Sequence, residues 1–269
     1  LTNGKEVKIP ILESTNVLTV GVVGTGKSKS YTLPATRYLL AANPMMKGVF
    51  FETKRTFLDA FMQENDKVIA YDPTIVPARN LFQWCLIKEI RQARDKEGEM
   101  RQIAEVLFGD LLAGAENNRA WIESARNTFI AVLRVIVDCY PDNTSNWDLI
   151  NALRNMSVND LLAYLSKHPR NHSLLSKDFG FDVSKKDSYI PTRRATDVMF
   201  FFNSVLEVWG GSFESKGQET IHDYLHGAPE YGRNLFLVHD LATPESSRPF
   251  ILYFLKKIKD EKMGLSSTI

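Results

Sequence analysis

Short apolar runs alternate with helix-length amphipathic segments in the first part of the chain and again near its end. Runs rich in β-branched and aromatic residues predict buried strands at residues 16–20, 48–52, 67–71 and 234–238. Helices are expected at 29–42, where Pro34 should kink or shorten the first turns, and at 57–62. Strands that alternate with helices predict a parallel sheet covered on both faces, and therefore an α/β fold.

The pattern changes between about residue 80 and residue 176, where no strand signal intervenes. Amphipathic segments there predict helices at 86–112, 121–137, 147–153 and 158–165, the last with Ser157 as its N-cap. The longest apolar run, 129–137, is interrupted by Arg134 and is too short to cross a bilayer. We therefore expect an α/β domain built from residues 1–85 and 195–269, with an all-helical domain, residues 86–194, inserted between its two parts.

A glycine-rich segment lies between the first predicted strand and the helix that follows it. Residues 21–28 read Gly-Val-Val-Gly-Thr-Gly-Lys-Ser, a complete G-x-x-x-x-G-K-[ST] phosphate loop in the strand–loop–helix context that the motif needs. The glycines let backbone N–H groups turn toward phosphate oxygens, and the helix N-terminus adds a partial positive charge. Lys27 would reach the β- and γ-phosphates, and the Ser28 hydroxyl would bind Mg²⁺. The segment predicts binding of a nucleoside triphosphate through Gly21, Val22, Val23, Gly24, Thr25, Gly26, Lys27, Ser28 and Lys29.

The net charge and the composition of the chain exclude few classes of function. Lys and Arg number 33 against 32 Asp and Glu, so the formal net charge of +1 argues neither for nor against a nucleic-acid partner. The stretch 167–194 is locally basic, with seven Lys or Arg against three Asp, and is expected to be a loop. It is the best electrostatic candidate for a contact with a phosphate backbone, and the alternative is a solvated loop.

Cysteines, histidines and tryptophans point to structural roles. The two cysteines are far apart and form no disulfide framework or zinc motif. Two histidine pairs have i,i+4 spacing, 168/172 and 222/226, but neither has the glutamate of an H-E-x-x-H motif, so we interpret them as surface or core residues. The four tryptophans lie in apolar helical stretches and are expected to be core anchors: Trp84, Trp121, Trp147 and Trp209.

Several segments, in a fixed order, resemble the conjugative type IV coupling proteins, the TraD/TrwB-type DNA motors of type IV secretion. Residues 51–58, Phe-Glu-Thr-Lys-Arg-Thr-Phe-Leu, are similar to the family's D-P-K-G-E-type segment, and residues 72–84 are similar to its N-P-L-D…R…W-N-x-F stretch. A tryptophan-led helix at 121–126, and the segment 219–225 before the strand 235–238, also match in order and spacing.

The chain departs from the family pattern at two positions of the first segment and in one larger feature. Glu52 stands in place of the family's aspartate, and Arg55 stands in place of its glycine. No hydrophobic run ending in Asp-Glu, the family's Walker B site, appears in the sequence.

The resemblance implies a RecA-like P-loop NTPase fold with a mainly parallel sheet and an inserted all-helical domain. It implies ATP-driven transfer of DNA or nucleoprotein, with ATP and Mg²⁺ as cofactors. The implied partners are single- or double-stranded DNA, relaxase-type substrate proteins and secretion-channel components. A homo-hexamer at the cytoplasmic face of the inner membrane is also implied, with the membrane anchor supplied by sequence outside this chain.

The carboxylate that orients Mg²⁺ has two candidate positions. The strand 235–238 is followed two residues later by Asp240, which could serve, although Leu241 stands where a catalytic glutamate would come next. The segment 242–249 and the helix after it are more similar to the family's elements just before Walker B. On this second and favoured interpretation, the Walker B strand lies beyond Ile269.

Glu52, at the end of its predicted strand, is a further candidate for a carboxylate that supports catalysis. The alternative is a solvated or salt-bridged strand terminus. Lys27, Glu52 and Asp240 are therefore the candidate catalytic residues.

Two other functions stay open. The first is a nucleotide-binding module that recruits substrate proteins without turnover, with the helical insertion as the contact surface. The second is a HerA/FtsK-like ring ATPase, related to chromosome-segregation or end-processing motors.

Overall fold

The computed structural model describes residues 31–44, 46–182, 184, 190–227 and 231–266. The chain divides into two compact units, residues 1–46 and residues 47–269. The strand expected at 16–20 and the phosphate loop at 21–28 lie outside the described residues.

In the first unit the structure describes helix α1 (Leu33–Ala42), with Pro34 in its first turn. A proline at this position lacks an N–H that the helix could not pair internally, and its fixed φ angle suits the start of a helix. Pro34 is therefore compatible with the first turn of α1. The predicted helix start at residue 29 lies outside the described residues.

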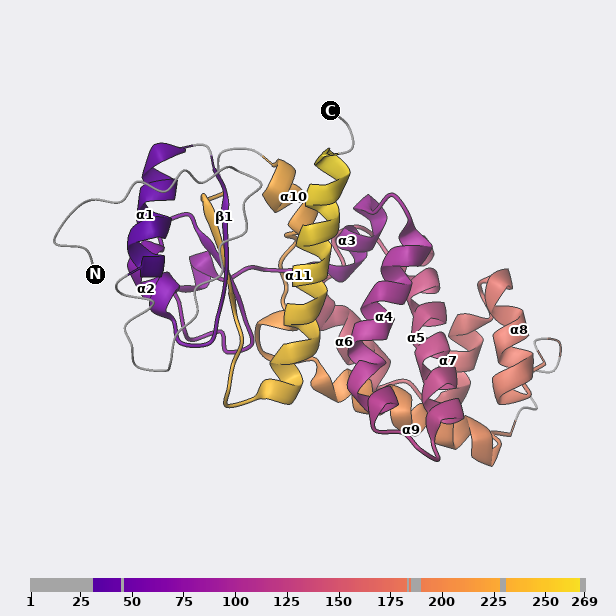
Figure 1. Ribbon diagram of the computed structural model, residues 1–269. Helices are drawn as coiled ribbons and strands as arrows, with labels where there is room; N and C mark the ends of the chain where they lie inside the picture. Colours follow the sequence, from indigo (N-terminus) through magenta and orange to yellow (C-terminus); the bar gives the residue numbers. More distant parts are fainter. Residues whose placement is uncertain (1–30, 45, 183, 185–189, 228–230, 267–269) are drawn as a thin grey trace. The chain divides into compact units, whose positions relative to one another are not determined.

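In the second unit, parallel strands form a sheet in the order β1-β3-β2 (Figure 1). The strands are β1 (Gly48–Glu52), β2 (Lys67–Ala70) and β3 (Asn234–Val238), as predicted, except that β2 ends one residue earlier than expected. The late strand β3 lies between the two early ones, with Phe236 opposite both Phe50 and Val68. Every residue of β3 is buried, which explains its nearly continuous apolar sequence.

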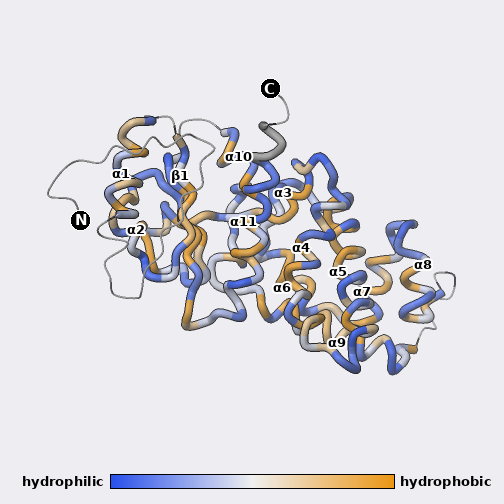
Figure 2. The backbone as a smooth tube through the Cα atoms, viewed as in Figure 1, coloured by the Kyte–Doolittle hydropathy of each residue, from blue (hydrophilic) through white to orange (hydrophobic). Residues whose placement is uncertain are grey.

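Apolar side chains cover both faces of this sheet. On one face α2 (Thr56–Phe61) packs against the strands, and the rings of Phe50 and Phe236 stack with their centroids 5.0 Å apart. Leu235 and Leu237, which alternate with Phe236 along β3, join the larger core on the other face. Figure 2 shows hydrophobic residues along the strands. The two-faced covering predicted from the strand pattern is confirmed.

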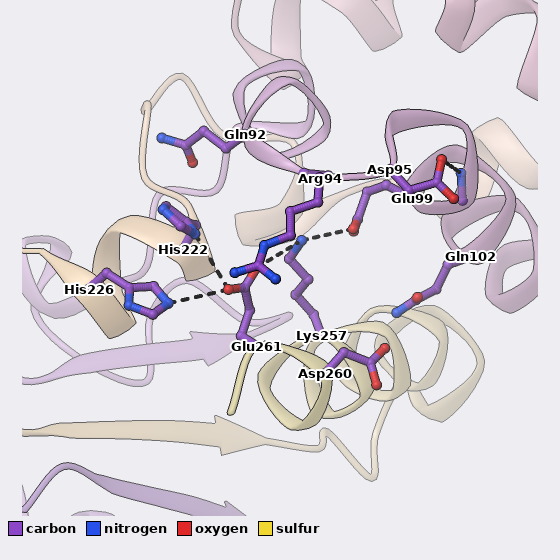
Figure 3. Close-up of a pocket in the computed structure, with 12 residues that line it drawn as sticks. Gln92, Arg94, Asp95, Glu99, Gln102, His222, His226, Lys257, Asp260 and Glu261 are labelled. Carbon is purple, nitrogen blue, oxygen red and sulfur yellow. Dashed lines mark hydrogen bonds and ion pairs between the residues drawn. The ribbon is translucent and has the colours of Figure 1, made fainter. Parts of the chain in front are cut away.

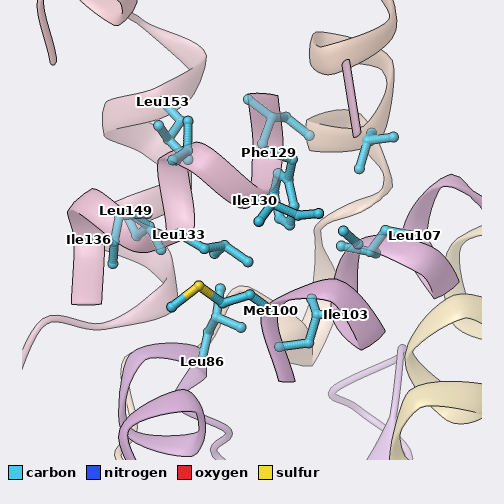
Figure 4. Close-up of a cluster of buried hydrophobic side chains, with 14 of the residues drawn as sticks. Leu86, Met100, Ile103, Leu107, Phe129, Ile130, Leu133, Ile136, Leu149 and Leu153 are labelled. Atoms are coloured by element: carbon cyan, nitrogen blue, oxygen red, sulfur yellow. The ribbon is translucent and has the colours of Figure 1, made fainter. Parts of the chain in front are cut away.

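Helix α11 (Pro244–Ser266) connects the sheet with a group of helices, because it contacts β2, α4 and α10 (Figure 1). The other helices of the second unit are α3 (Leu86–Gln92), α4 (Lys96–Ala113), α5 (Arg119–Cys139), α6 (Asn146–Arg154), α7 (Val158–Leu165), α9 (Arg193–Val208) and α10 (Ile221–His226). Both α4 and α9 pack against α5, and leucine, isoleucine, methionine and phenylalanine side chains fill the space between the helices (Figure 4).

Helix α5 is buried on nearly every side along residues 129–137. Arg134 is the exception in this apolar run, and its guanidinium binds the Glu97 carboxylate with both oxygens, at 2.7 Å and 2.9 Å. The two-pronged ion pair lets a charged residue occupy the central helix and joins α5 to α4. Among the residues that the structure describes, no helix is long and apolar enough to cross a membrane.

Side-chain caps set several helix ends. The Ser157 side chain caps α7, and the Asp160 carboxylate accepts a hydrogen bond from the Ser157 backbone N–H, so the predicted N-cap is part of a full capping box. Asp95 caps α4 through the N–H of Gly98. This cap, with the turn at 93–95, divides the single helical region expected at 86–112 into α3 and α4.

The basic stretch expected to be a loop is partly helical, which corrects the sequence prediction. A 3₁₀ turn (Pro169–Asn171), the short helix α8 (His172–Leu174) and a π-helix (Leu175–Phe179) follow one another. Leu175 and Phe179 are fully buried. Burial of these two side chains stabilises the helical backbone. The many charged residues around them in the sequence had predicted a loop instead.

Helices α9 and α11 come from the later part of the chain. Helix α9 packs against α5, α6 and α7. Helix α11 begins at Pro244, and Pro249 lies inside it. Pro244 is itself well suited to a helix start, because the N–H that proline lacks would have no partner within the helix there.

The tryptophans divide into two kinds. Trp84 and Trp209 are buried core anchors whose rings stack with centroids 5.8 Å apart. Trp147 is 42% exposed, with the Lys216 ammonium 4.2 Å from its ring centroid. The prediction that Trp147 is a core anchor is therefore wrong. Apolar residues lie near Trp147 in the sequence, but its side chain lies on the outer face of the short helix α6.

Candidate functional site

The carboxyl ends of the three strands meet at one edge of the sheet, where parallel α/β sheets place their ligands. A pocket of 220 Å³ lies at this edge. Its walls include one charged residue from the segment after each strand: Arg55 after β1, Asp72 after β2 and Asp240 after β3. We take this edge as the candidate functional site within the second unit.

Glu52, the last residue of β1, is buried, and its carboxylate is bound by the next helix. The backbone N–H groups of Phe57 and Leu58 donate to its two oxygens at 2.9 Å and 2.8 Å. Glu52 therefore caps the N-terminus of α2, where the positive end of the helix dipole also favours a carboxylate. One interpretation of the sequence expected a solvated or salt-bridged strand end. The Glu52 side chain is instead buried, and it forms no ion pair with any residue that the structure describes. Its assignment to catalysis stays a prediction.

Replacing Glu52 by alanine is expected to lower the free energy of unfolding by about 2–3 kcal/mol. The change leaves two N–H groups of α2 without an acceptor, and a hydrogen bond to a charged group is stronger than a neutral one. Glu52→Gln keeps one acceptor oxygen and should lose about half as much. Urea unfolding of the two variants measures both values. An alanine variant as stable as the parent would contradict the capping role.

Arg55 has φ of 58°, the left-handed region that favours glycine. Residue 55 is the position at which the coupling-protein pattern has glycine, and a left-handed backbone form at this turn is consistent with that pattern. The Arg55 guanidinium lies 3.7 Å from Asp59 in an exposed pair, which adds little.

Arg55→Gly is expected to stabilise the chain by about 0.5 kcal/mol, because relief of the left-handed conformation outweighs the extra entropy that glycine has in the unfolded state. Arg55→Ala removes the same side chain but keeps the Cβ atom, so it should give no gain. Thermal unfolding of the two variants makes the comparison. Equal stability of the glycine and alanine variants would show that the backbone at residue 55 is not strained.

Asp240 lies in the turn after β3 and stabilises this turn through hydrogen bonds. Its two carboxylate oxygens accept hydrogen bonds from the Ala242 N–H at 2.8 Å and the Thr243 hydroxyl at 2.9 Å. Asp72, in the same pocket, accepts two hydrogen bonds from Thr74, which lower the pKa of its carboxyl. The pocket thus contains two oriented carboxylates.

The structure brings some of the predicted site residues together and adds others. Asp240 lines the edge pocket, and Glu52 ends the strand beside it, since the His239 N–H donates to the Glu52 carbonyl at 2.9 Å. Lys27, Ser28 and the rest of the phosphate loop lie outside the described residues. Sequence reasoning did not name Asp72 as a site residue, although its position directly after a predicted strand was a usable signal.

Two arginines of the basic stretch form ion pairs with acidic residues of the same chain. Arg194 binds Asp178 at 2.8 Å, and Arg170 lies 3.6 Å from Glu97. Lys167, Lys177 and Arg193 are exposed. The charge available to a partner is therefore smaller than the sequence count suggests.

A second cluster of charges surrounds a pocket of 730 Å³ between the α3–α4 turn, α10 and α11 (Figure 3). The buried Lys257 ammonium lies 2.8 Å from Glu99, 3.7 Å from Glu89 and 3.4 Å from Glu261. Burial acts to lower the pKa of Lys257, but the carboxylates of Glu89 and Glu99 outweigh it and hold that pKa above its ordinary value. Lys257 is therefore the countercharge for three carboxylates.

The free energy of unfolding is expected to fall as the pH rises from about 4.5 to about 7, because unfolding releases the Glu89 proton over this range. Burial raises the pKa of its carboxyl to about 7 because desolvation penalises the charged form. Between these values the folded state keeps a proton that the unfolded state releases, so the free energy of unfolding falls with rising pH, by on the order of 2 kcal/mol. Glu89→Gln cannot titrate, so unfolding at about pH 5 and about pH 8 should show a smaller fall in this variant. The same fall in both proteins would contradict the assignment.

Comparison with known proteins supplies the context for these sites. A family model described as the type IV secretion-system coupling protein DNA-binding domain matches residues 7–267. A comparison with curated protein sequences found no significant match.

Solved structures of one coupling protein are similar to the chain. The unbound bacterial conjugative coupling protein TrwBdeltaN70 is 16% identical, with a TM-score of 0.56 over 87% of this chain and 49% of that chain. The plasmid coupling protein TrwB in complex with the non-hydrolysable ATP analogue ADPNP is 16% identical, with a TM-score of 0.56 over 87% of this chain and 50% of that chain. The complex with the GTP analogue GDPNP is 16% identical, with a TM-score of 0.57 over 88% of this chain and 50% of that chain.

The chain spans about half the length of these structures. At this sequence identity the likeness establishes the fold, and the RecA-like α/β class with added helices is confirmed. The division of the chain into two sequence-defined domains stays a prediction.

Proposed function

The chain belongs to the type IV secretion-system coupling protein DNA-binding domain family, and we propose that it is part of an ATP-driven motor that transfers DNA or nucleoprotein in conjugation or type IV secretion. The observation that carries the proposal is the family match over residues 7–267 in a chain with a complete phosphate-loop sequence at 21–28. A DNA-binding family and a nucleotide-binding motif in one chain are the two parts that a DNA motor needs.

Nucleotide binding is assigned to the phosphate loop. Complexes of TrwB with ADPNP and GDPNP support a nucleoside triphosphate as the ligand of this fold. Lys27 would carry the positive charge that stabilises the transferred phosphoryl group, and the Ser28 hydroxyl would bind Mg²⁺.

The carboxylate that orients Mg²⁺ is proposed to be Asp240 or a residue beyond Ile269. Asp72 and Asp240 give the edge pocket the oxygen donors that Mg²⁺ prefers, and hydrogen bonds already orient both carboxylates. Mg²⁺ would neutralise the phosphate charge that develops during hydrolysis. Leu241, 62% exposed, offers no group that could activate water at the next position.

The proposed partners follow from the family. We propose single- or double-stranded DNA as the direct ligand, with relaxase-type proteins as substrates and secretion-channel components as the docking target. A homo-hexamer at the cytoplasmic face of the inner membrane completes the proposal, with its anchor outside this chain. Exposed Lys167, Lys177 and Arg193 support a phosphate-backbone contact, which should weaken as salt concentration rises.

The test is the ATPase rate with and without single-stranded and double-stranded DNA. It should be measured on this chain and on one that continues past Ile269. DNA-stimulated turnover in either form supports the motor, and loss of turnover in Asp240→Ala places the Mg²⁺-orienting carboxylate within this chain. Nucleotide binding without turnover in both forms overturns the motor and supports the substrate-recruiting module instead.

A further inference from the structure

Two histidines and one glutamate from distant parts of the chain converge beside the larger pocket (Figure 3). His222 and His226 lie one turn apart on α10, with ring centroids 4.7 Å apart. Glu261 reaches them from α11. One ligand atom from each of the three side chains lies within 4.8 Å of the other two.

The spacing of these atoms fits a bound transition-metal ion. The Glu261 Oε2 atom lies 3.4 Å from His222 Nδ1 and 3.3 Å from His226 Nε2. Two ligands at about 2.1 Å from a tetrahedral Zn²⁺ are about 3.4 Å apart, so both of these distances match. The two histidine nitrogens lie within 4.8 Å of each other. Two imidazoles and one carboxylate are also a donor set that Zn²⁺ takes in proteins.

The second oxygen of Glu261 is held by a different partner. Glu261 Oε1 lies 3.4 Å from the Lys257 ammonium, which Glu99 fixes in turn at 2.8 Å. Figure 3 shows Lys257 between the two carboxylates. Outer groups of this kind orient a metal ligand and leave its other oxygen free to coordinate.

The surroundings favour a cation with an open coordination position. The pocket of 730 Å³ is lined by four carboxylates, from Asp95, Glu99, Asp260 and Glu261, against one guanidinium and one ammonium. The side chains of His222, His226 and Glu261 are 40%, 30% and 20% exposed, so an ion can reach them from solvent. A fourth ligand, water or a small anion, has room in the pocket.

We propose that His222, His226 and Glu261 bind one Zn²⁺ ion, with water in the fourth position. The ion links α10 to α11. Since α10 precedes β3 and α11 follows it, the link would fasten both segments that flank the central strand of the sheet. The site does not depend on the motor proposal.

The experiment titrates the chain with Zn²⁺ by calorimetry and with Co²⁺ by visible absorption. We expect one Zn²⁺ per chain with a dissociation constant of about 1 µM or lower. Co²⁺ should give the intense visible bands of a four-coordinate ion. His222→Ala, His226→Ala and Glu261→Gln should each weaken Zn²⁺ binding by at least about 100-fold. Loss of an outer-shell partner already weakens binding by up to about 100-fold, and these variants remove a direct ligand.

The other i,i+4 histidine pair is the matched control. His168 lies 3.0 Å from Asp138, and His172 bonds a backbone carbonyl. A His168→Ala/His172→Ala double variant should bind Zn²⁺ as the parent does. Unchanged affinity in His222→Ala, or no stoichiometric Zn²⁺ binding with an octahedral Co²⁺ spectrum in the parent, would overturn the proposal. The Co²⁺ spectrum needs no variant, so it stands even where a substitution unfolds the chain.

Discussion

Lys27→Ala is expected to lower nucleotide turnover by about 100- to 1,000-fold and to weaken nucleotide binding. The lysine of a phosphate loop places a positive charge against the β- and γ-phosphates, and the loss of one oriented donor from such a site has an effect of this size. Binding of a fluorescent ATP analogue measures the first step in this chain. Steady-state hydrolysis measures the second in whichever form of the chain turns over.

Lys256→Ala is the control for this change, because it removes one positive charge from the surface of α11. Its side chain is 47% exposed and pairs only weakly with Glu105, at 3.8 Å. It should bind nucleotide as the parent does. Unchanged nucleotide affinity and turnover in Lys27→Ala would remove the assignment of residues 21–28 as a phosphate loop, and with it the main support for the motor proposal.

Lys257→Met is expected to lower the free energy of unfolding by about 3–5 kcal/mol. The Lys257 side chain is 5% exposed, and its ammonium is the countercharge for Glu89, Glu99 and Glu261. Methionine has a similar length but no charge, so the change removes the countercharge of Glu89 and Glu99, which are buried, and this is more costly than the original pair was favourable. Urea unfolding at neutral pH measures the loss.

Lys256, the residue before Lys257, provides the control variant. Lys256→Met makes the same chemical change one position earlier, on the exposed side of the helix, and should alter stability by no more than about 0.5 kcal/mol. Adding Glu99→Gln to Lys257→Met should recover part of the loss, because Glu99 is the carboxylate closest to the ammonium. Equal stabilities of the two methionine variants would show that the buried charge cluster is not coupled as described.

Much of the local structure could be predicted from residue patterns. The three described strands agree with the prediction to within one residue, because β-branched and aromatic runs between polar turns carry their own signal. Ser157 was identifiable as a cap because Asp160 follows three residues later. The family was also recognisable, since its segments recur in order along the chain.

Other features had no local signal. The helical form of residues 169–179 depends on Leu175 and Phe179 entering a core formed by other helices. Trp147 has apolar neighbours in sequence but lies on the outer face of its helix. Glu52 was recognisable as a strand end, yet its capping of α2 depends on the left-handed turn at Arg55 that brings the helix back to it.

The sequence by itself therefore determined the three described strands, most of the described helices and the family, because side-chain periodicity and motif spacing are properties of neighbouring residues. The nucleotide-binding segment stays a prediction from its motif. Only the tertiary structure decided which distant side chains meet. Glu261 lies 35 residues after His226, and Lys257 lies 158 residues after Glu99. Spacing along the chain does not encode such contacts, because packing of whole helices brings these groups together and burial then sets their charge and ligand chemistry.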